Sequence, residues 1–454
     1  MPERPLHELG VHEAVRQIRA GRLTATALVE ALIGRIEAVD PAVQAWVAVD
    51  RAGALEGAAA LDAEAASGRF RGPLHGVPVG LKDIFHAAGL KTTAGARGFA
   101  DVVPGEDATS VARLRAAGAV ILGKLHTTEF AFLDPAPTLN PWDPARTPGG
   151  SSSGSAAAVA ARMVPAALGS QTVGSTLRPA AFCGVVGLKP TYGRVSRRGV
   201  VPVSWSLDHV GILAREVADV ALLLSVLAAR DDADPGSARR PPPELGSVVT
   251  AVPERPPRLG LVGEPFLARA TPEMRAHLDA VAARLAGRGA GVEPVALPAV
   301  VPALLAAVQV VVHAEAASVH ADLHRAHAGE YRPKIRAALE AGMCVPASLY
   351  LRAQRIRRQA RRELRPLLER FDALLMPATA GPAPDRAGTG DPSFNAPWSG
   401  VGVPSIALPT GLAADGLPLA IQLVSAAFDE ARLLAAARWV EAAVGFAAAP
   451  PDAR

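Results

Sequence analysis

The sequence predicts an α/β fold in which helices cover both faces of a β-sheet. Short apolar runs at 76–81 and 119–124 are typical of strands that are buried on both sides. The segment 110–118, which lies between them, has the apolar spacing of a helix. Because strands and helices alternate in this way, the pattern favours a sheet that lies between two layers of helices.

Composition narrows the class of protein. The chain has 454 residues, of which 50% are hydrophobic, so it can bury a large core. It carries 47 Lys and Arg against 43 Asp and Glu, and this near balance, without a dense basic block, argues against a nucleic-acid binder. Cys183 and Cys344 are its only cysteines, which excludes a disulfide framework and fits a reducing compartment. We therefore expect a cytoplasmic protein.

The remaining elements are predicted in chain order. Residues 5–48 and 53–66 have helical spacing, whereas 230–258, rich in Pro, Arg, Asp and Ser, is expected to be a loop. The apolar window 295–312 is interrupted by prolines, and a membrane span needs ~20 clean apolar residues, so we expect buried structure and no membrane contact. Later segments complete the fold with strands at 258–263, 371–379 and 403–411 and helices at 274–289, 345–371 and 429–446.

Two glycine-rich turns carry serines. In the first, Gly149 and Gly150 precede Ser151, and the chain continues into an Ala-rich apolar helix, which a flexible linker would not do. In the second, Ser175 follows an apolar run and a glycine. A serine on such a turn exposes its hydroxyl, and the backbone N–H groups of residues 172–175 can converge on one oxygen. Either turn alone is also compatible with an ordinary serine-bearing turn.

Lys82 follows six uncharged residues at the end of the run 76–81. A free lysine has a pKa of ~10.4 and is a cation at pH 7. Burial disfavours the charged form, so a buried lysine can act as a base. The structural alternative is a lysine at a strand end that extends its ammonium group to solvent, with Asp83 as its ion-pair partner.

These segments resemble the amidase signature family. The matching runs are GVPVGLKDI (76–84), GKLHTTEF (123–130), PGGSSSGSAAAVAA (148–161), GSQTVGSTLRPAAFCGVVGLKPTYGRVS (169–196) and SLDHVG (206–211), and the likeness extends into 373–379 and 403–424. The resemblance implies one large α/β domain over residues 1–454, with a mixed, mostly parallel, twisted sheet. Within it we expect a core at 65–220 and 370–450 and a more variable, helical, cap-like region at about 230–370.

The family hydrolyses amide bonds with a Ser–cisSer–Lys triad through an acyl-enzyme. The resemblance implies Ser175 as the nucleophile, Ser151 with a cis peptide bond as the bridging serine, and Lys82 as the base. It implies an oxyanion hole made by Thr172, Val173, Gly174 and Ser175, and we expect Gly149, Gly150, Arg178 and Trp398 at the substrate. No metal or cofactor is required. The expected partner is a small-molecule amide, ester or carbamate. The resemblance is also compatible with a homodimer.

The second turn departs from the family pattern. Val173 replaces the first of two glycines before the nucleophile; because valine tolerates a positive φ poorly, either its φ is negative or the oxyanion hole is reshaped. Gln171 stands where Asp is common, and Leu177 takes the place of an arginine found in many members. Arg178 follows one position later, and it either binds a substrate carboxylate or makes structural contacts.

Two alternatives to a free-standing amidase are open. The chain could be the glutaminase-like subunit of a tRNA-dependent amidotransferase, which belongs to the same family and passes ammonia to a partner. Val173 also makes a catalytically impaired scaffold conceivable. The sequence does not identify the substrate, because the same attack cleaves amides, esters and carbamates.

Overall fold

The structure is a computed structural model that describes residues 5–96 and 101–451. Within this part of the chain, one eleven-stranded sheet runs through the molecule in the order β1-β3-β2-β4-β6-β5-β10-β11-β9-β7-β8. The strands are β1 (Trp46–Val49), β2 (Pro78–Lys82), β3 (Val120–Leu125), β4 (Ala166–Gln171), β5 (Val186–Lys189), β6 (His209–Ala214), β7 (Arg258–Val262), β8 (Gly291–Val295), β9 (Ala373–Pro377), β10 (Ser405–Leu412) and β11 (Pro418–Val424).

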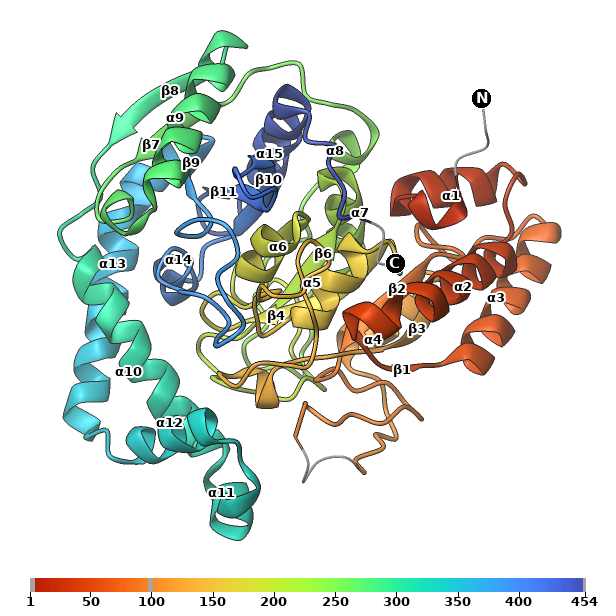
Figure 1. The fold of residues 1–454 in the computed structure, drawn as a ribbon, viewed down its shortest axis with the longest axis horizontal. Helices are drawn as coiled ribbons and strands as arrows, with labels where there is room; N and C mark the ends of the chain where they lie inside the picture. The colour runs from red at the N-terminus through yellow and green to blue at the C-terminus, as the bar shows by residue number, and fades with distance from the viewer. Residues whose placement is uncertain (1–4, 97–100, 452–454) are drawn as a thin grey trace.

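Helices cover both faces of this sheet, which confirms the predicted α/β class (Figure 1). On the central strands, α5 packs beside α6, and α7 packs beside α15. The helices are α1 (Val11–Arg19), α2 (Ala25–Val43), α3 (Arg51–Ala66), α4 (Thr109–Ala116), α5 (Ser153–Ala160), α6 (Leu177–Cys183), α7 (Val217–Leu227), α8 (Gly246–Thr250), α9 (Pro272–Gly287), α10 (Val301–Val319), α11 (Ala321–His327), α12 (Pro333–Met343), α13 (Ala347–Arg370), α14 (Ala396–Val401) and α15 (Glu430–Val444).

The central strands are buried along their whole length. Every residue of β2, β3, β4 and β6 is buried. Strands covered on both sides have no polar face, which is why they appear in the sequence as continuous apolar runs rather than as alternating patterns. The two runs that predicted strands correspond to β2 and β3.

The sheet is mixed, as predicted, but the expectation of mostly parallel pairing is wrong. The parallel pairs are β2 with β3 and β4, and β7 with β8 and β9. The other pairs in the described sheet are antiparallel. The reason is that β6 lies between β4 and β5 and runs opposite to both, and β10 and β11 are consecutive antiparallel neighbours. Alternation of helices and strands does not exclude such insertions.

The region 230–370 is not only helical, because β7 and β8 join the sheet at its edge. Its helices α12 and α13 both pack on α10, and α10 and α13 also contact α14, at the opposite side of the molecule from α1–α3 (Figure 1). By length and composition α10 could cross a membrane, but half of its apolar window is buried inside the protein. One such helix is weak evidence for a membrane span, because the core helix of a globular protein passes the same test.

Two element boundaries also differ from the prediction. The helical stretch 5–48 ends at Val43, and residues 46–49 form β1 at the sheet edge. The Ala-rich helix after Ser151 is shorter than its apolar run, because β4 begins at Ala166. In both cases the apolar segment is compatible with a helix or a strand, and pairing with neighbouring strands makes it a strand.

Candidate active site

Lys82 is the last residue of β2 and is fully buried. Its Nζ donates hydrogen bonds of 2.7 Å to Ser151 Oγ and of 2.7 Å to Ser170 Oγ. Ser170 lies near the end of β4, the parallel neighbour of β2. Because parallel strands end at the same edge of a sheet, the two strand ends place this lysine and this serine side by side.

Lys82 has no carboxylate partner in the described structure. Its neighbour Asp83 is ion-paired to Lys124 instead, with 2.8 Å between Nζ and Oδ1, and accepts a hydrogen bond from Thr93 N. Burial therefore lowers the pKa of Lys82 well below its usual value, and the more distant charge of Asp208 opposes this shift. A neutral amine that contacts two hydroxyls is suited to accept a proton.

Ser151 lies on the first glycine-rich turn, directly before α5. The peptide bond between Gly150 and Ser151 is cis. Gly149 has a φ of +79°, and a Cβ there would lie 2.9 Å from Pro179 Cα. A Cβ on Gly150 would lie 2.6 Å from Thr389 Cγ2. Both positions therefore require glycine, and this close packing holds the serine against Lys82.

Ser175 lies on the second turn, between β4 and α6. Its side chain is partly exposed, whereas Ser151 is buried. A hydrogen bond of 3.1 Å from Ser152 N to the Ser175 carbonyl joins the two turns. Among the described residues, neither Ser175 Oγ nor the backbone N–H groups of 172–175 have a protein hydrogen-bond partner. The turn thus presents a free hydroxyl beside free N–H donors.

Gln171 sets the shape of this turn. Its Oε1 accepts hydrogen bonds from Thr176 N (2.9 Å) and Leu177 N (3.0 Å). Its Nε2 donates to the carbonyl of Val173 (3.3 Å) and to Ser399 Oγ (3.0 Å). An Asp carboxylate could accept the first pair but could not donate the second.

Val173 is not among the described residues with a positive φ. Of the two possibilities that the sequence raised, a negative φ at Val173 or a reshaped oxyanion hole, the structure shows the negative φ. The valine therefore fits this turn without left-handed backbone strain. At Gly174, unlike at position 173, a side chain would be crowded, because a Cβ there would lie 2.8 Å from Asn395 Oδ1.

Helix α14 packs against the second turn and forms hydrogen bonds with it. Ser399 Oγ donates a hydrogen bond of 2.9 Å to the Val173 carbonyl. Asn395, at the start of α14, is held by Ala378 O and Gln422 Oε1. Sequence reasoning missed Ser399 and Ser170, since the only signal was a serine in a buried segment, which is common in any protein.

Asp208 holds the first residue of the turn. It accepts hydrogen bonds from Thr172 Oγ1 (2.6 Å), Val203 N (2.8 Å) and Ser204 N (2.9 Å). Burial raises the pKa of this carboxyl, and these donors oppose the shift. The motif SLDHVG, singled out in the sequence, therefore contacts the second turn through its aspartate, which binds the side-chain hydroxyl of Thr172.

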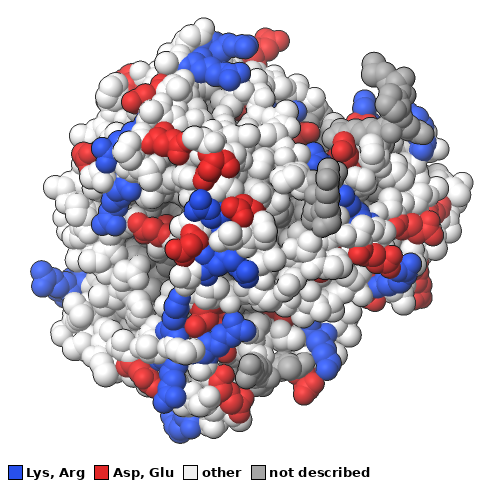
Figure 2. Space-filling view, viewed as in Figure 1, with Lys and Arg blue, Asp and Glu red and all other residues white. Residues whose placement is uncertain are grey.

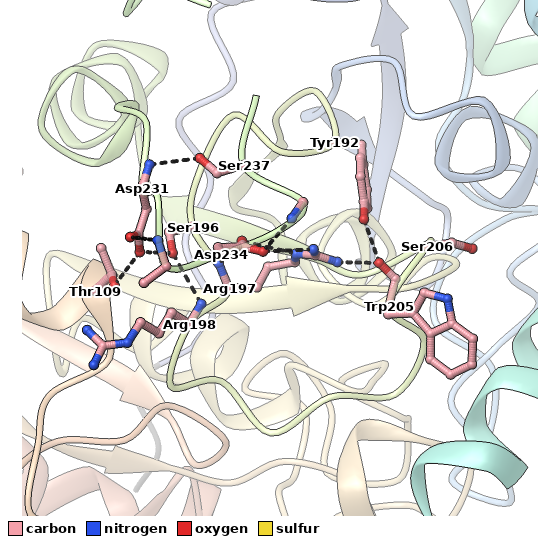
Figure 3. Close-up of polar contacts among 12 residues, drawn as sticks. Thr109, Tyr192, Ser196, Arg197, Arg198, Trp205, Ser206, Asp231, Asp234 and Ser237 are labelled. Carbon is pink, nitrogen blue, oxygen red and sulfur yellow. Dashed lines mark hydrogen bonds and ion pairs between the residues drawn. The ribbon is translucent and has the colours of Figure 1, made fainter. Parts of the chain in front are cut away.

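A cavity of about 270 Å³ extends to Ser170. Its wall includes Ile84, and Trp205 at its rim is 47% exposed. Arg197 fixes this rim, because it is ion-paired to Asp234 (3.1 Å) and donates to the Trp205 carbonyl (Figure 3). One of its lining residues, Ser170, is also the hydrogen-bond partner of Lys82.

Two residues expected at the substrate lie elsewhere or act differently. Trp398 has no exposed surface and packs against Phe266, so the structure does not bring it to the site. Arg178 Nη2 donates to Gly150 O (2.8 Å) and Thr389 Oγ1 (3.0 Å), which are structural contacts. Its buried Nε and Nη1 have no hydrogen-bond partner, and burial lowers the pKa of this arginine to about 10. Two of its donors are therefore free.

The described residues contain no group of three His, Cys, Asp or Glu placed to hold a metal ion. The groups that lie in this region are a buried lysine whose pKa is lowered by burial, three serine hydroxyls and unpaired backbone donors. Such a set can activate a hydroxyl, stabilise an oxyanion and protonate a leaving group.

Comparisons with known proteins agree with this chemistry. The family model described as Amidase matches residues 27–434. A glutamyl-tRNA(Gln) amidotransferase subunit from Anaeromyxobacter dehalogenans (strain 2CP-C) is 41% identical over 495 residues, with 99% of each chain covered. The native peptide amidase from Stenotrophomonas maltophilia is 33% identical, with a TM-score of 0.87 and 98% of this chain and 99% of that chain covered.

Another similar structure comes from a vestigial protein complex that reveals the evolutionary origins of an s-triazine catabolic enzyme. It is 35% identical, with a TM-score of 0.90 and coverage of 97% of this chain and 99% of that chain. Fold and neighbours together define a hydrolase that acts on the carbon–nitrogen bonds of amides. The chain belongs to the Amidase family, which confirms the resemblance.

Proposed function

We propose that this amidase uses Ser175 as its nucleophile, Ser151 as a proton relay and Lys82 as its base. The observation that carries the proposal is the environment of Lys82, a buried lysine that contacts only serine hydroxyls while the adjacent carboxylate of Asp83 pairs with Lys124. A protonated lysine in that place would be a buried, unpaired cation, which is strongly unfavourable.

The proposed reaction proceeds through an acyl-enzyme. Lys82 takes the proton of Ser151, Ser151 takes that of Ser175, and Ser175 Oγ attacks the carbonyl carbon. The free N–H groups of Thr172, Val173, Gly174 and Ser175 stabilise the oxyanion, and each such donor contributes roughly two to three orders of magnitude in rate. The proton then passes to the leaving nitrogen as the carbon–nitrogen bond breaks, and water attacks the acyl-enzyme by the reverse relay.

We infer that the substrate is a small-molecule amide, with esters and carbamates also cleaved. The free donors of Arg178, beside Gly150 and close to Gly174, support recognition of a substrate carboxylate near the scissile bond. Gly149 and Gly150 are proposed to approach the substrate only through their backbone, because protein atoms fill the space where a Cβ would lie. On the face shown in Figure 2, basic and acidic side chains are intermixed, which supports a protein that binds no nucleic acid.

The second candidate function is that of an amidotransferase subunit. It is favoured by the curated relatives, which are named as subunits of glutamyl-tRNA(Gln) amidotransferase. In that case the ammonia released at Ser175 would be passed to a partner protein. The two functions share the triad and differ in whether hydrolysis needs that partner.

A substrate panel measured on the isolated protein tests the proposal. Anilides, primary amides, esters and carbamates should include at least one compound that wild type hydrolyses and that Ser175→Ala does not. Full activity of Ser175→Ala on every active compound would contradict the assigned nucleophile. Glutaminase activity that appears only with a co-purified partner would favour the subunit function.

A further inference from the structure

A second cavity, of about 370 Å³, lies between α13, the end of α14 and the segment 426–428. Its apolar wall includes Leu364, Leu368, Val403 and the ring of Phe428. Three arginines, Arg240, Arg361 and Arg365, line it together with a single acid, Glu369. A cavity of this size suits a small ligand.

Two of the three arginines, Arg240 and Arg361, are exposed and have no acidic partner among the described residues. Glu369 is ion-paired to Arg365, with 2.7 Å between Oε1 and Nε. Within the described residues, neither Arg240 nor Arg361 has a carboxylate within 4.0 Å. Arg361 uses only Nε, in a hydrogen bond to Val401 O, and Arg240 makes no described hydrogen bond. The cavity therefore offers guanidinium donors beside an apolar wall.

Phe428 gives this wall a fixed and costly conformation. Its φ is +65°, a left-handed value that is rare for a bulky residue. Arg194 and Arg240 lie over its ring, at 4.8 and 5.5 Å from the centroid. Arg194 is itself anchored by the buried carboxylate of Glu430 at 2.9 Å. Backbone strain of this kind persists only where the surroundings enforce it, and it is concentrated at binding sites.

One short helix, α14, connects the cavity to the second turn, residues 172–175. At its end, α14 is held by Arg361, which donates to the Val401 carbonyl over 3.0 Å, and by Arg357, which donates to the Gly400 carbonyl over 2.9 Å. On the same helix Ser399 donates to the carbonyl of Val173. A ligand that engages Arg361 therefore acts on the helix that positions Val173.

We propose that this cavity binds a small organic carboxylate with an apolar body, and that the bound ligand changes the reactivity of Ser175 through α14. The carboxylate bonds to Arg240 and Arg361, and the apolar body lies against Phe428 and Leu364. The binding site is independent of the proposed function, whereas the effect on Ser175 rests on it.

Isothermal titration calorimetry tests the site, with benzoate and hexanoate as probes and benzyl alcohol as the neutral control. Benzoate should bind wild type, and Arg240→Gln and Arg361→Gln should each weaken it about 10-fold, because each removes a charge-assisted contact. Arg362→Gln, an exposed neighbour on α13 outside the cavity, should bind benzoate as wild type does. Equal affinity in Arg240→Gln and wild type, or equal binding of benzyl alcohol, would overturn the site.

The rate at which a fluorophosphonate labels Ser175 tests the coupling. Saturating benzoate should change this rate in wild type by at least about 3-fold, a shift of roughly 0.6 kcal/mol, and should leave it unchanged in Arg240→Gln. A labelling rate that is the same with and without benzoate would overturn the coupling. Failure of Ser175 to be labelled in the absence of benzoate would instead contradict the proposed function, while the calorimetric result would stand.

Discussion

Three buried lysines illustrate how partners decide what a residue can do. Lys124 is paired to the carboxylate of Asp83. Lys189 donates to the Val403 carbonyl over 2.5 Å, and burial lowers its pKa to about 7. Lys82 contacts only hydroxyls, which themselves can carry a proton. We therefore expect the base to be the buried lysine whose hydrogen-bond partners are hydroxyls.

The pH dependence of activity follows from the lowered pKa of Lys82. Below that pKa the lysine holds a proton and cannot accept another, so kcat/KM should rise with pH through it and give a neutral to alkaline optimum. A pH–rate profile on any active amide or ester measures this. A maximum near pH 5 would contradict a neutral-lysine mechanism.

Gln171→Glu isolates the donor function of the glutamine amide. The variant keeps the acceptor for Thr176 N but replaces the Nε2 donor by a carboxylate oxygen, which repels the Val173 carbonyl. We expect kcat to fall about 10- to 100-fold, less than the roughly two to three orders of magnitude that follow the loss of an oxyanion donor, because the donors are displaced and not removed, with little change in KM. Steady-state kinetics beside Gln359→Glu, an exposed change of the same chemistry, measures this effect. An unchanged kcat would mean that Gln171 does not shape the turn.

At the scale of elements, the order of the strands in the sheet decides which side chains lie next to Lys82. The sequence singles out Lys82, Ser151 and Ser175 because each lies in a glycine-rich or apolar motif, and the family resemblance implies their roles, which stay predictions. Ser170 and Ser399 could not be predicted, because they reach the site only through the pairing of β2 with β4 and the packing of α14 behind the turn. The same limit explains the wrong expectation for strand direction, since no local pattern places β6 between β4 and β5.

Ser399→Ala tests the support from α14. The variant removes the hydrogen bond to the Val173 carbonyl but leaves the buried helix packing intact. We expect kcat to fall by about 10-fold, equal to the ~1.4 kcal/mol net value of one hydrogen bond at the upper end, while the melting temperature changes little. Restored activity in Ser399→Thr, which keeps the hydroxyl, is the matching control. A large fall in melting temperature with normal kcat would show a purely structural role.

At the scale of the whole molecule, distant segments are joined by buried carboxylates. Asp219 on α7 accepts hydrogen bonds from Val11 N (3.0 Å) and His12 N (2.8 Å), which are the first backbone groups of α1. A carboxylate at a helix N-terminus satisfies donors that the helix itself cannot. This contact fixes α1 to α7, and so connects residues that lie far apart in the sequence.

Stability should depend on pH through Asp219. Burial raises the pKa of this carboxyl to about 6 from 3.8, so the folded state binds more protons between these values. The protonated carboxyl stabilises the folded state, and this stabilisation is fully present below the unfolded pKa and is lost as pH rises to about 6. The free energy of unfolding should therefore fall by about 3 kcal/mol over this range, at 1.36 kcal/mol per pKa unit. Urea unfolding from pH 4 to 7 should show a flatter profile for Asp219→Asn than for wild type. Parallel profiles would contradict this linkage.

The central claim is that Ser175 is activated by a neutral Lys82 through Ser151. The most direct measurement is peptide mass spectrometry after reaction with a fluorophosphonate, on wild type, Lys82→Met and Ser175→Ala. The account predicts a covalent adduct on Ser175 in wild type, a labelling rate lower by at least about 100-fold in Lys82→Met, as expected when a general base is lost, and no adduct in Ser175→Ala. An adduct on another serine, or undiminished labelling of Lys82→Met, would contradict it.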